Sequence, residues 1–390
     1  MPQGVETATS QWTVPVNRTT FGVLSLGAFI VTALGLTTGT DWQLQFLAIA
    51  ITSVAILALK SLAPRLGLID HPQGHKTHDG DVPVIGGLAI YIGLAFTLPL
   101  TALPGSTIFA LLASCGLLVA LGALDDRYHL PVWARFGAQV GAALIMIEWG
   151  GVMLTDLGQL VGDETFTLGR WSILVTVVAT IGVINSMNMA DGLDGLAGTL
   201  ALATFGMAAI WAASGHPEIA CIALLACSAL TAFLAFNAPL PSRDPRARVF
   251  MGDAGSMMLG LLIAWVLITL SQGPDRAFPA VTALWLFALP LLDTLSVMLR
   301  RMLRGRSPFA PDREHLHHIL IVAGYSNRAV VGIMFVGAML FAAFGLLMFK
   351  TGIPDYWQFT TALGVFVLIN IALRRAWRVQ RILHKFSQRG

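Results

Sequence analysis

Apolar stretches of about 20 residues recur along almost the whole chain, and each is long enough to cross a lipid bilayer as a helix. Only 12% of the 390 residues are charged, whereas soluble proteins average about 25%. The pattern therefore predicts an all-α polytopic membrane protein with about 11–12 transmembrane helices. The stretches lie near residues 21–38, 43–63, 84–103, 106–124, 134–149, 171–189, 197–214, 218–237, 255–271, 278–299, 328–349 and 357–373.

The chain divides into a polar N-terminal segment (1–20), a transmembrane domain (21–374) and a basic tail (375–390). The N-terminal segment lacks the basic-then-apolar order of a cleaved signal peptide, so we expect the first span to be retained. The three cysteines all lie inside apolar stretches, which favours small buried thiols over disulfides.

Basic residues are concentrated on alternate connections between the predicted spans and in the C-terminal tail. The positive-inside rule assigns these connections, and both termini, to the cytoplasm. They include Lys60, Arg65, Lys76, Arg127, Arg135, Arg243, Arg246, Arg248, Arg300, Arg301, Arg304, Arg306 and Arg313. On the opposite, periplasmic side, residues 150–169 alternate apolar and polar side chains around Gly162–Asp163, a pattern typical of a small β-hairpin or an interfacial loop.

Polar side chains collect at the predicted cytoplasmic ends of the spans. Asp125 and Asp126 follow the fourth span, Asp253 precedes the ninth, and a histidine motif follows the tenth (His315, His317 and His318). Each has a plain structural alternative: a solvated helix end for the acid pair, an N-cap for Asp253, and an ordinary loop for the histidines. A helix C-terminus disfavours anions, however, so the acid pair predicts a nearby positive charge.

The segment "SMNMADGLDGLAG" (186–198) combines amides, acids and glycines where one apolar stretch gives way to the next. Asn185, Asn188, Asp191 and Asp194 recur at every third residue, and each such step falls about 60° short of a full helical turn. The four cannot all face one partner on a regular helix. We expect Asn188 and Asp191 to point from the helix end and Asp194 to enter from the turn that follows.

These oxygen donors form a set that suits Mg²⁺ or Mn²⁺. Surrounding basic groups such as Lys76 and Arg135 suit phosphate, so the combination predicts a phosphoryl-transfer site at the inner membrane surface. A cation-coupled transporter, the alternative from another class, places its acids near the middle of the membrane and often carries an internal repeat. Here the acids are at span ends, and the sequence shows no repeat.

Five separated motifs resemble those of the polyprenyl-phosphate N-acetylhexosamine-1-phosphate transferases, across residues 66–327. They are "LIDHPQGHKTHDGDVPVIGG", "GALDDRYHL", "NSMNMADGLDGLAG", "VFMGDAGS" and "SPFAPDREHLHHIL". The resemblance implies a multi-pass protein of the bacterial inner membrane with its active site facing the cytoplasm. It implies transfer of N-acetylglucosamine-1-phosphate from UDP-N-acetylglucosamine to undecaprenyl phosphate with release of UMP, the first membrane step of O-antigen and related polysaccharide synthesis.

The same resemblance implies roles for individual residues. Asn188 and Asp253 hold Mg²⁺ or Mn²⁺, and Asp253 is catalytic together with Asp125 and Asp126, which position or deprotonate the lipid phosphate. The implied substrate-binding residues are Lys76, Arg135, Asp191, Gly192, Asp194, His315, His317 and His318, with Arg135 at the lipid phosphate, Gly192 and Asp194 at the uridine, and the histidines at the sugar phosphate or sugar.

Two positions depart from the family pattern. His129 stands where relatives often have a third acid, and the first loop reads "GHKTH" where relatives are more basic, so Lys76 is its main cation. The sequence leaves open another UDP-amino sugar as donor, and leaves a homodimer as one option. It predicts no nucleic-acid partner.

Overall fold

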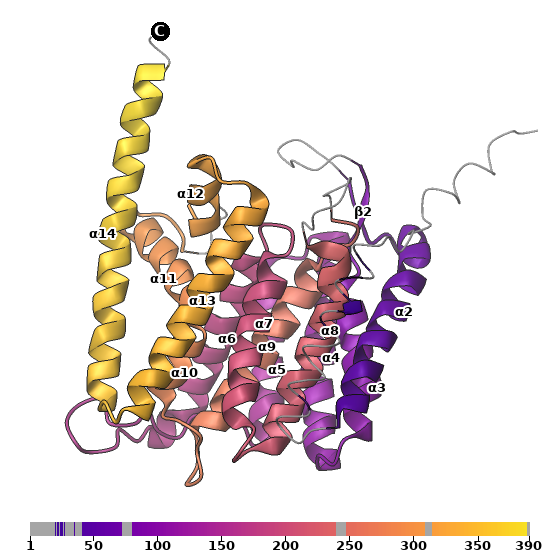
Figure 1. Cartoon of the computed structure of the whole chain (residues 1–390), viewed down its shortest axis with the longest axis horizontal. Coiled ribbons are helices and arrows are strands. Elements are labelled where there is room, and N and C mark those ends of the chain that lie inside the picture. Colours follow the sequence, from indigo (N-terminus) through magenta and orange to yellow (C-terminus); the bar gives the residue numbers. More distant parts are fainter. Residues whose placement is uncertain are drawn as a thin grey trace, which may run out of the picture.

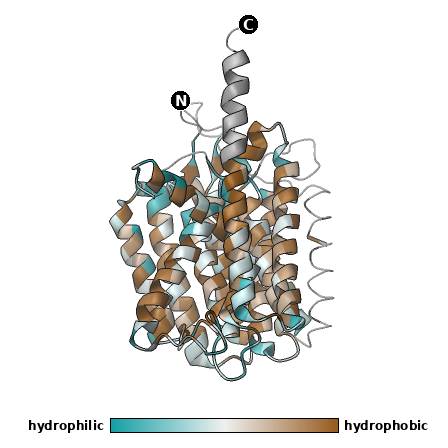
Figure 2. Ribbon diagram, turned by 90° about the vertical axis from the view of Figure 1, so that its left-hand side faces the viewer, coloured by the Kyte–Doolittle hydropathy of each residue, from teal (hydrophilic) through white to brown (hydrophobic). Residues whose placement is uncertain are grey.

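The computed structural model describes residues 41–71, 80–238, 247–308 and 314–387, with a few single residues between 20 and 35 and with side chains as far as residue 373. The helices form a bundle whose long axes run in nearly the same direction (Figure 1). Hydrophobic residues dominate the middle of the bundle, and hydrophilic residues gather at its two ends (Figure 2). This distribution is the one a bilayer requires.

The helices are α2 (Trp42–Leu66), α3 (Gly86–Thr97), η2 (Leu98–Leu100), α4 (Gly105–Tyr128), α5 (Val132–Glu148), η3 (Gly169–Trp171), α6 (Ser172–Ala190), α7 (Leu196–Ala212), α8 (Pro217–Asn237), α9 (Gly252–Ser271), α10 (Ala280–Leu286), α11 (Ala288–Leu303), α12 (Leu316–Val322), α13 (Asn327–Lys350) and α14 (Asp355–Ser387). Two short strands, β1 (Ile69–Asp70) and β2 (Val82–Pro83), pair in antiparallel fashion.

Every apolar stretch from 43–63 onward coincides with a helix or a helix pair, which confirms the all-α membrane fold. The first stretch, 21–38, lies mostly outside the described residues. Within the described part, seven helices are long and apolar enough to cross a membrane, or eight if the bent pair α10 and α11 is one span. The helices over 86–100 and 196–212 are apolar but shorter, so length alone supports fewer full crossings than the eleven to twelve expected.

The stretch 278–299, predicted as a span, is broken in the structure. It is divided into α10 and α11, whose axes are bent by 87°. Phe287 leaves helical geometry at the break, with φ −116° and ψ 16°. Pro290 supplies a reason: it has no N–H for the carbonyl of Leu286, and its ring crowds that carbonyl.

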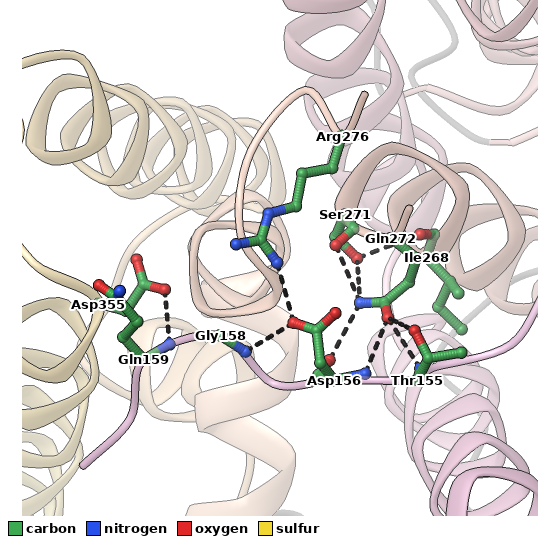
Figure 3. Close-up of polar contacts among 9 residues, drawn as sticks. All are labelled: Thr155, Asp156, Gly158, Gln159, Ile268, Ser271, Gln272, Arg276 and Asp355. Carbon is green, nitrogen blue, oxygen red and sulfur yellow. Dashed lines mark hydrogen bonds and ion pairs between the residues drawn. The ribbon is translucent and has the colours of Figure 1, made fainter. Parts of the chain in front are cut away.

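The predicted periplasmic hairpin is present as a compact loop with few ladder contacts. Isolated antiparallel bridges join Asp156 to Thr167 and Val161 to Glu164. Gly162 turns the chain at the tip with φ 70°, a conformation that favours glycine. The described residues of this loop contact the C-terminal end of α9 and the start of α14 (Figure 3).

Helix α9 lies at the centre of the bundle, and 94% of the residues in its apolar 18-residue stretch are buried. Its neighbours approach it closely because small residues line the contacts. A Cβ atom added at Gly87 on α3 would collide with the backbone of Gly255, and one added at Gly122 on α4 would collide with Ala254. The ends of α3 and α4 are therefore held against the first turn of α9.

A short run of backbone hydrogen bonds fixes the chain that leads into α9. The amides of Gly86 and Gly87 donate to the carbonyls of Phe250 and Met251 at 2.9 and 3.0 Å. The amide of Phe250 in turn donates to the carbonyl of Pro83 at 2.9 Å. The first turn of α9 is thus positioned by one sequence-distant segment, residues 83–87, at the end of the bundle where β2 and α12 lie (Figure 1).

Candidate active site

The acid pair at the end of α4 lies against the N-terminus of α9. The Asp126 carboxylate accepts hydrogen bonds from the backbone amides of Asp253 (2.9 Å, Oδ1) and Ala254 (3.4 Å, Oδ2). These amides are among the donors that a helix start leaves unpaired, and they carry the positive end of the helix dipole. The positive charge predicted beside the acid pair is thus supplied in part by α9 itself.

Asp125, the other acid of the pair, is almost fully buried. Its Oδ1 accepts a hydrogen bond from the amide of Leu130 at 2.6 Å, whereas its Oδ2 accepts none. Arg135 Nη1, on α5, lies 3.3 Å from Asp125 Oδ2 and 3.6 Å from Asp253 Oδ2. One guanidinium therefore stands between two carboxylates, with a third of its side chain exposed.

Asn188, near the end of α6, completes the contact between three helices. Its Nδ2 donates to Asp253 Oδ1 at 2.7 Å and to the Ser256 hydroxyl at 3.0 Å. Asp126, Asn188 and Asp253 come from parts of the chain more than 60 residues apart, and hydrogen bonds connect all three. The sequence could not have identified Ser256 as the second partner of Asn188.

The segment after α6 places Asp191 and Asp194 beyond the end of the helix. α6 ends at Ala190, Asp191 follows the helix, and Asp194 lies in the turn that Gly195 closes with φ 82°. Asp194 Oδ2 accepts a hydrogen bond from the amide of Ala247 at 3.3 Å. Asn185 does not share this direction: its Nδ2 donates to Gln139 Oε1 on α5 at 2.8 Å.

Asn237, at the end of α8, is a structural residue of the site that the sequence did not reveal. Its Oδ1 accepts from the amide of Gly195 at 2.7 Å, and its Nδ2 donates to the carbonyl of Val249 at 2.8 Å. Because it is buried and bridges two loops, it holds the Asp194 turn against the chain that enters α9.

The histidine motif reaches the same site through α12. A Cβ atom added at Gly192 would lie 2.5 Å from His317 Nε2, so the imidazole occupies the space that a side chain there would need. The His318 ring lies 4.1 Å from the His317 ring, centroid to centroid. His315 Nδ1 lies 2.9 Å from Oδ2 of Asp293, an α11 acid that the sequence analysis did not single out. An acid inside the apolar run "ALPLLDTLSV" was the available signal.

Among the described side chains, the carboxylates of the site outnumber the cations in contact with them. Burial, together with the charges of Asp253, Asp126 and Asp194, raises the pKa of Asp191 to about 8. Arg135 is the cation in contact with the cluster among the described side chains. Crowded carboxylates with so little compensation fit a site that binds a further cation.

The donors present fit a hard divalent ion that is shared with a substrate. Among the described residues, no group of three histidine, cysteine, aspartate or glutamate side chains forms a metal site of its own. Mg²⁺ typically takes only one or two protein carboxylates and completes its shell with water and substrate phosphates. Asp253 with the amide oxygen of Asn188 fits that requirement, as does the buried Asp125 Oδ2 that accepts no hydrogen bond.

Most of the residues predicted for the site converge, as described above. Lys76 lies outside the described residues, as do Arg246 and Arg313. The thiols of Cys115 and Cys227 are buried as predicted, whereas Cys221 is only partly buried.

Comparison with known proteins agrees with the motifs. The glycosyl transferase family 4 profile matches residues 108–271. The undecaprenyl-phosphate alpha-N-acetylglucosaminyl 1-phosphate transferase of Escherichia coli (strain K12) is 34% identical over 360 residues, which cover 91% of this chain and 96% of that protein. The proteins of the same name from Yersinia pestis and Haemophilus influenzae are 36% and 35% identical, over 88% and 86% of this chain and 95% of each relative. This chain therefore belongs to glycosyl transferase family 4.

Proposed function

We propose that this protein transfers N-acetylglucosamine-1-phosphate from UDP-N-acetylglucosamine to undecaprenyl phosphate, forming undecaprenyl-diphosphate-N-acetylglucosamine and UMP. The observation that carries the proposal is the meeting of Asp126, Asn188 and Asp253 at one end of the bundle, with Arg135 beside them. The names of the relatives, which align along nearly their whole length, supply the substrates.

We propose that the site faces the cytoplasm of a bacterial inner membrane. The basic connections support this orientation through the positive-inside rule. The acids lie at the ends of α4 and α6 and at the start of α9, and not at mid-helix, which favours a transferase over the transporter alternative. At the membrane surface a water-soluble nucleotide sugar and a lipid phosphate can meet.

In the proposed reaction an oxygen of the lipid phosphate attacks the β-phosphorus of the nucleotide sugar in line with the departing UMP. A phosphate monoester has its second pKa near 6, so the nucleophile is largely ionised at neutral pH. A general base therefore contributes little, and the harder task is to bring two polyanions together. For this reason we favour direct attack over a covalent aspartyl intermediate.

Different side chains of the site bind the two anionic substrates. Arg135 lies beside Asp125 and Asp253 and is one-third exposed, so it is placed to bind the lipid phosphate and orient it. Asp125, buried against Arg135, fixes the direction of the guanidinium. Asp253 and the Asn188 amide oxygen hold Mg²⁺ or Mn²⁺, which when bound neutralises charge on the diphosphate. Asp191, Gly192 and Asp194 bind on the nucleotide side, next to His317.

The test is an assay of the purified protein in detergent with undecaprenyl phosphate, Mg²⁺ and several UDP-sugars, scored by UMP release and by the lipid product. We expect UDP-N-acetylglucosamine to be used best. Faster turnover with UDP-N-acetylgalactosamine or an acetylated deoxysugar would overturn the sugar assignment and leave the reaction class intact. No UMP release with any donor, combined with cation flux in vesicles that lack nucleotide sugar, would support the transporter instead.

A further inference from the structure

The histidine motif is attached to α11 by two side chains that no motif singled out. Asp293 is buried, and its Oδ2 lies 2.9 Å from His315 Nδ1 while its Oδ1 accepts from the amide of Leu316 at 2.9 Å. One carboxylate thus fixes both the ring of His315 and the first amide of α12. Because a carboxylate can only accept hydrogen bonds, the shared proton lies on His315 Nδ1.

Arg300 holds the residue that comes just before. Its Nε donates to Glu314 Oε2 at 3.3 Å, and its Nη2 donates to the Glu314 carbonyl at 2.8 Å. Asp293 and Arg300 are seven residues apart on α11, and on a helix this spacing places two side chains on the same face. Both are buried, so this face of α11 is a rigid template for residues 314–316.

His317 depends on this template because it has no anchor of its own in the described structure. Only 1% of its surface is exposed, and neither ring nitrogen has a hydrogen-bond partner. Its ring lies nearly parallel to that of His315, at an interplanar angle of 12° and a centroid distance of 5.7 Å. It is placed by ring contacts with His315 and His318.

The protonation state of the His317 imidazole suits it to hydrogen-bond a substrate. Burial, with the charge of His318 as the next cause, lowers the pKa of His317 to about 3, so the ring is neutral at pH 7. A neutral imidazole has one N–H donor and one acceptor nitrogen. Leaving a buried polar group unpaired is unfavourable, and a substrate group that enters beside Gly192 and hydrogen-bonds the ring would remove that cost.

We propose that Asp293 is a positioning residue for the transfer reaction: it fixes the His315 ring and through it sets His317 against the nucleotide-sugar side of the site. The proposal rests on the proposed function and adds to it an α11 acid that does not itself touch the reacting atoms. Arg300 supports the same arrangement by holding Glu314.

Asp293→Asn is the sharpest test because it keeps the size of the side chain and one acceptor oxygen. The amide can accept from Leu316 or from His315, not from both, and its NH₂ group favours the wrong tautomer of the imidazole. We expect kcat to fall by about 10- to 100-fold, the scale seen when a carboxylate that orients a functional histidine is lost. The KM for UDP-N-acetylglucosamine should change by less than about threefold, because the Asp191–Asp194 turn is untouched.

The matched control is Asp156→Asn at the opposite end of the bundle, where Asp156 pairs with Arg276. It removes a partly buried acid of the same size and should leave kcat unchanged. A second measurement is the double variant Asp293→Asn with His315→Gln. If Asp293 acts through His315, the double variant is no slower than the slower single variant.

Two outcomes of the activity measurements would overturn the proposal. One is a wild-type kcat in Asp293→Asn, measured per folded molecule after size-exclusion chromatography; the other is a fully additive loss in the double variant. The ¹⁵N NMR signal of His315, identified by its absence in His315→Gln, gives a readout that needs no activity. If Nδ1 is unprotonated the inference fails, whatever the enzyme does. An inactive wild type with Nδ1 protonated would instead count against the proposed function alone.

Discussion

The polar groups at the two ends of α9 differ in how completely they are paired. At the C-terminal end, Gln272 Oε1 accepts from the amides of Thr155 and Asp156 and from the Thr155 hydroxyl, and its Nε2 donates to the Asp156 carbonyl (Figure 3). Asp156 also pairs with Arg276 at 2.9 Å. At the N-terminal end, Asp253 lies near other carboxylates and shares Arg135 with Asp125.

This difference in pairing indicates that one end of α9 serves stability and the other serves function. A polar cluster whose donors and acceptors are matched stabilises the fold and has no capacity left for a ligand. A cluster with excess like charge reduces stability and is retained where a ligand supplies the missing charge. Substitutions at the Asp253 end should therefore remove activity from a protein that still folds. Substitutions at the Gln272 end should lower the stability of the fold and leave the activity unchanged.

The largest effect is expected from Asp253→Asn. The substitution keeps the shape and removes the charge that we propose holds the metal against the diphosphate, so transfer should fall by about 10³-fold or more. UMP release at saturating substrate and Mg²⁺ is the measurement, and elution of the variant as a folded species in detergent is the control. Full activity would exclude Asp253 from the site.

Gly192→Ala should have a smaller and more local effect. Its Cβ would lie 2.5 Å from His317 Nε2, so the imidazole must move. We expect about a tenfold loss in kcat/KM for the nucleotide sugar, roughly 1.4 kcal/mol. Gly182→Ala on α6 is the matched control, since no atom lies within 4 Å of its added Cβ. Equal losses in both variants would argue against the contact with His317.

Ionisation of Asp191 is expected to shift the unfolding temperature by a few degrees. Its pKa of about 8 in the fold exceeds the unfolded value of about 3.9, so the folded state keeps a proton that the unfolded state releases. The stability of the metal-free protein should then fall as pH rises from about 4 to about 8. Thermal unfolding in EDTA should show this decline, Asp191→Asn should flatten it, and Mg²⁺ should offset it near pH 8. A decline of the same size in Asp191→Asn would assign it to other groups.

The smallest effect is expected at the Gln272 end. Arg276→Gln breaks a partly exposed ion pair with Asp156, which should lower the free energy of unfolding by about 1 kcal/mol or less. The kcat should not change, because the substituted side chain lies at the opposite end of α9 from Asp253. A loss of turnover without a loss of stability would mean that the two ends are coupled through α9.

Much of this outcome was predictable from local features of the sequence. Apolar stretches located the helices, and the three-residue spacing from Asn185 to Asp194 predicted that these residues would not all face one partner, as the bond of Asn185 to Gln139 shows. The roles of Asp126 and Asp293 were not predictable in the same way. Asp126 reads as half of an acid pair, but both its oxygens are hydrogen-bonded to the first amides of α9. Asp293 lies within a single apolar run, and only the fold brings His315 to it.

The sequence by itself determined the membrane class, the positions of most helices and the chemical ingredients of the site, because hydropathy and residue spacing act over one or two turns of chain. Tertiary structure alone decided which carboxylate oxygens cap a helix and which stay open to a ligand. It also decided that the histidine motif rests on an acid of α11. Those outcomes depend on how closely helices approach one another at contacts such as Gly122 with Ala254, where the absence of a side chain lets two distant segments meet.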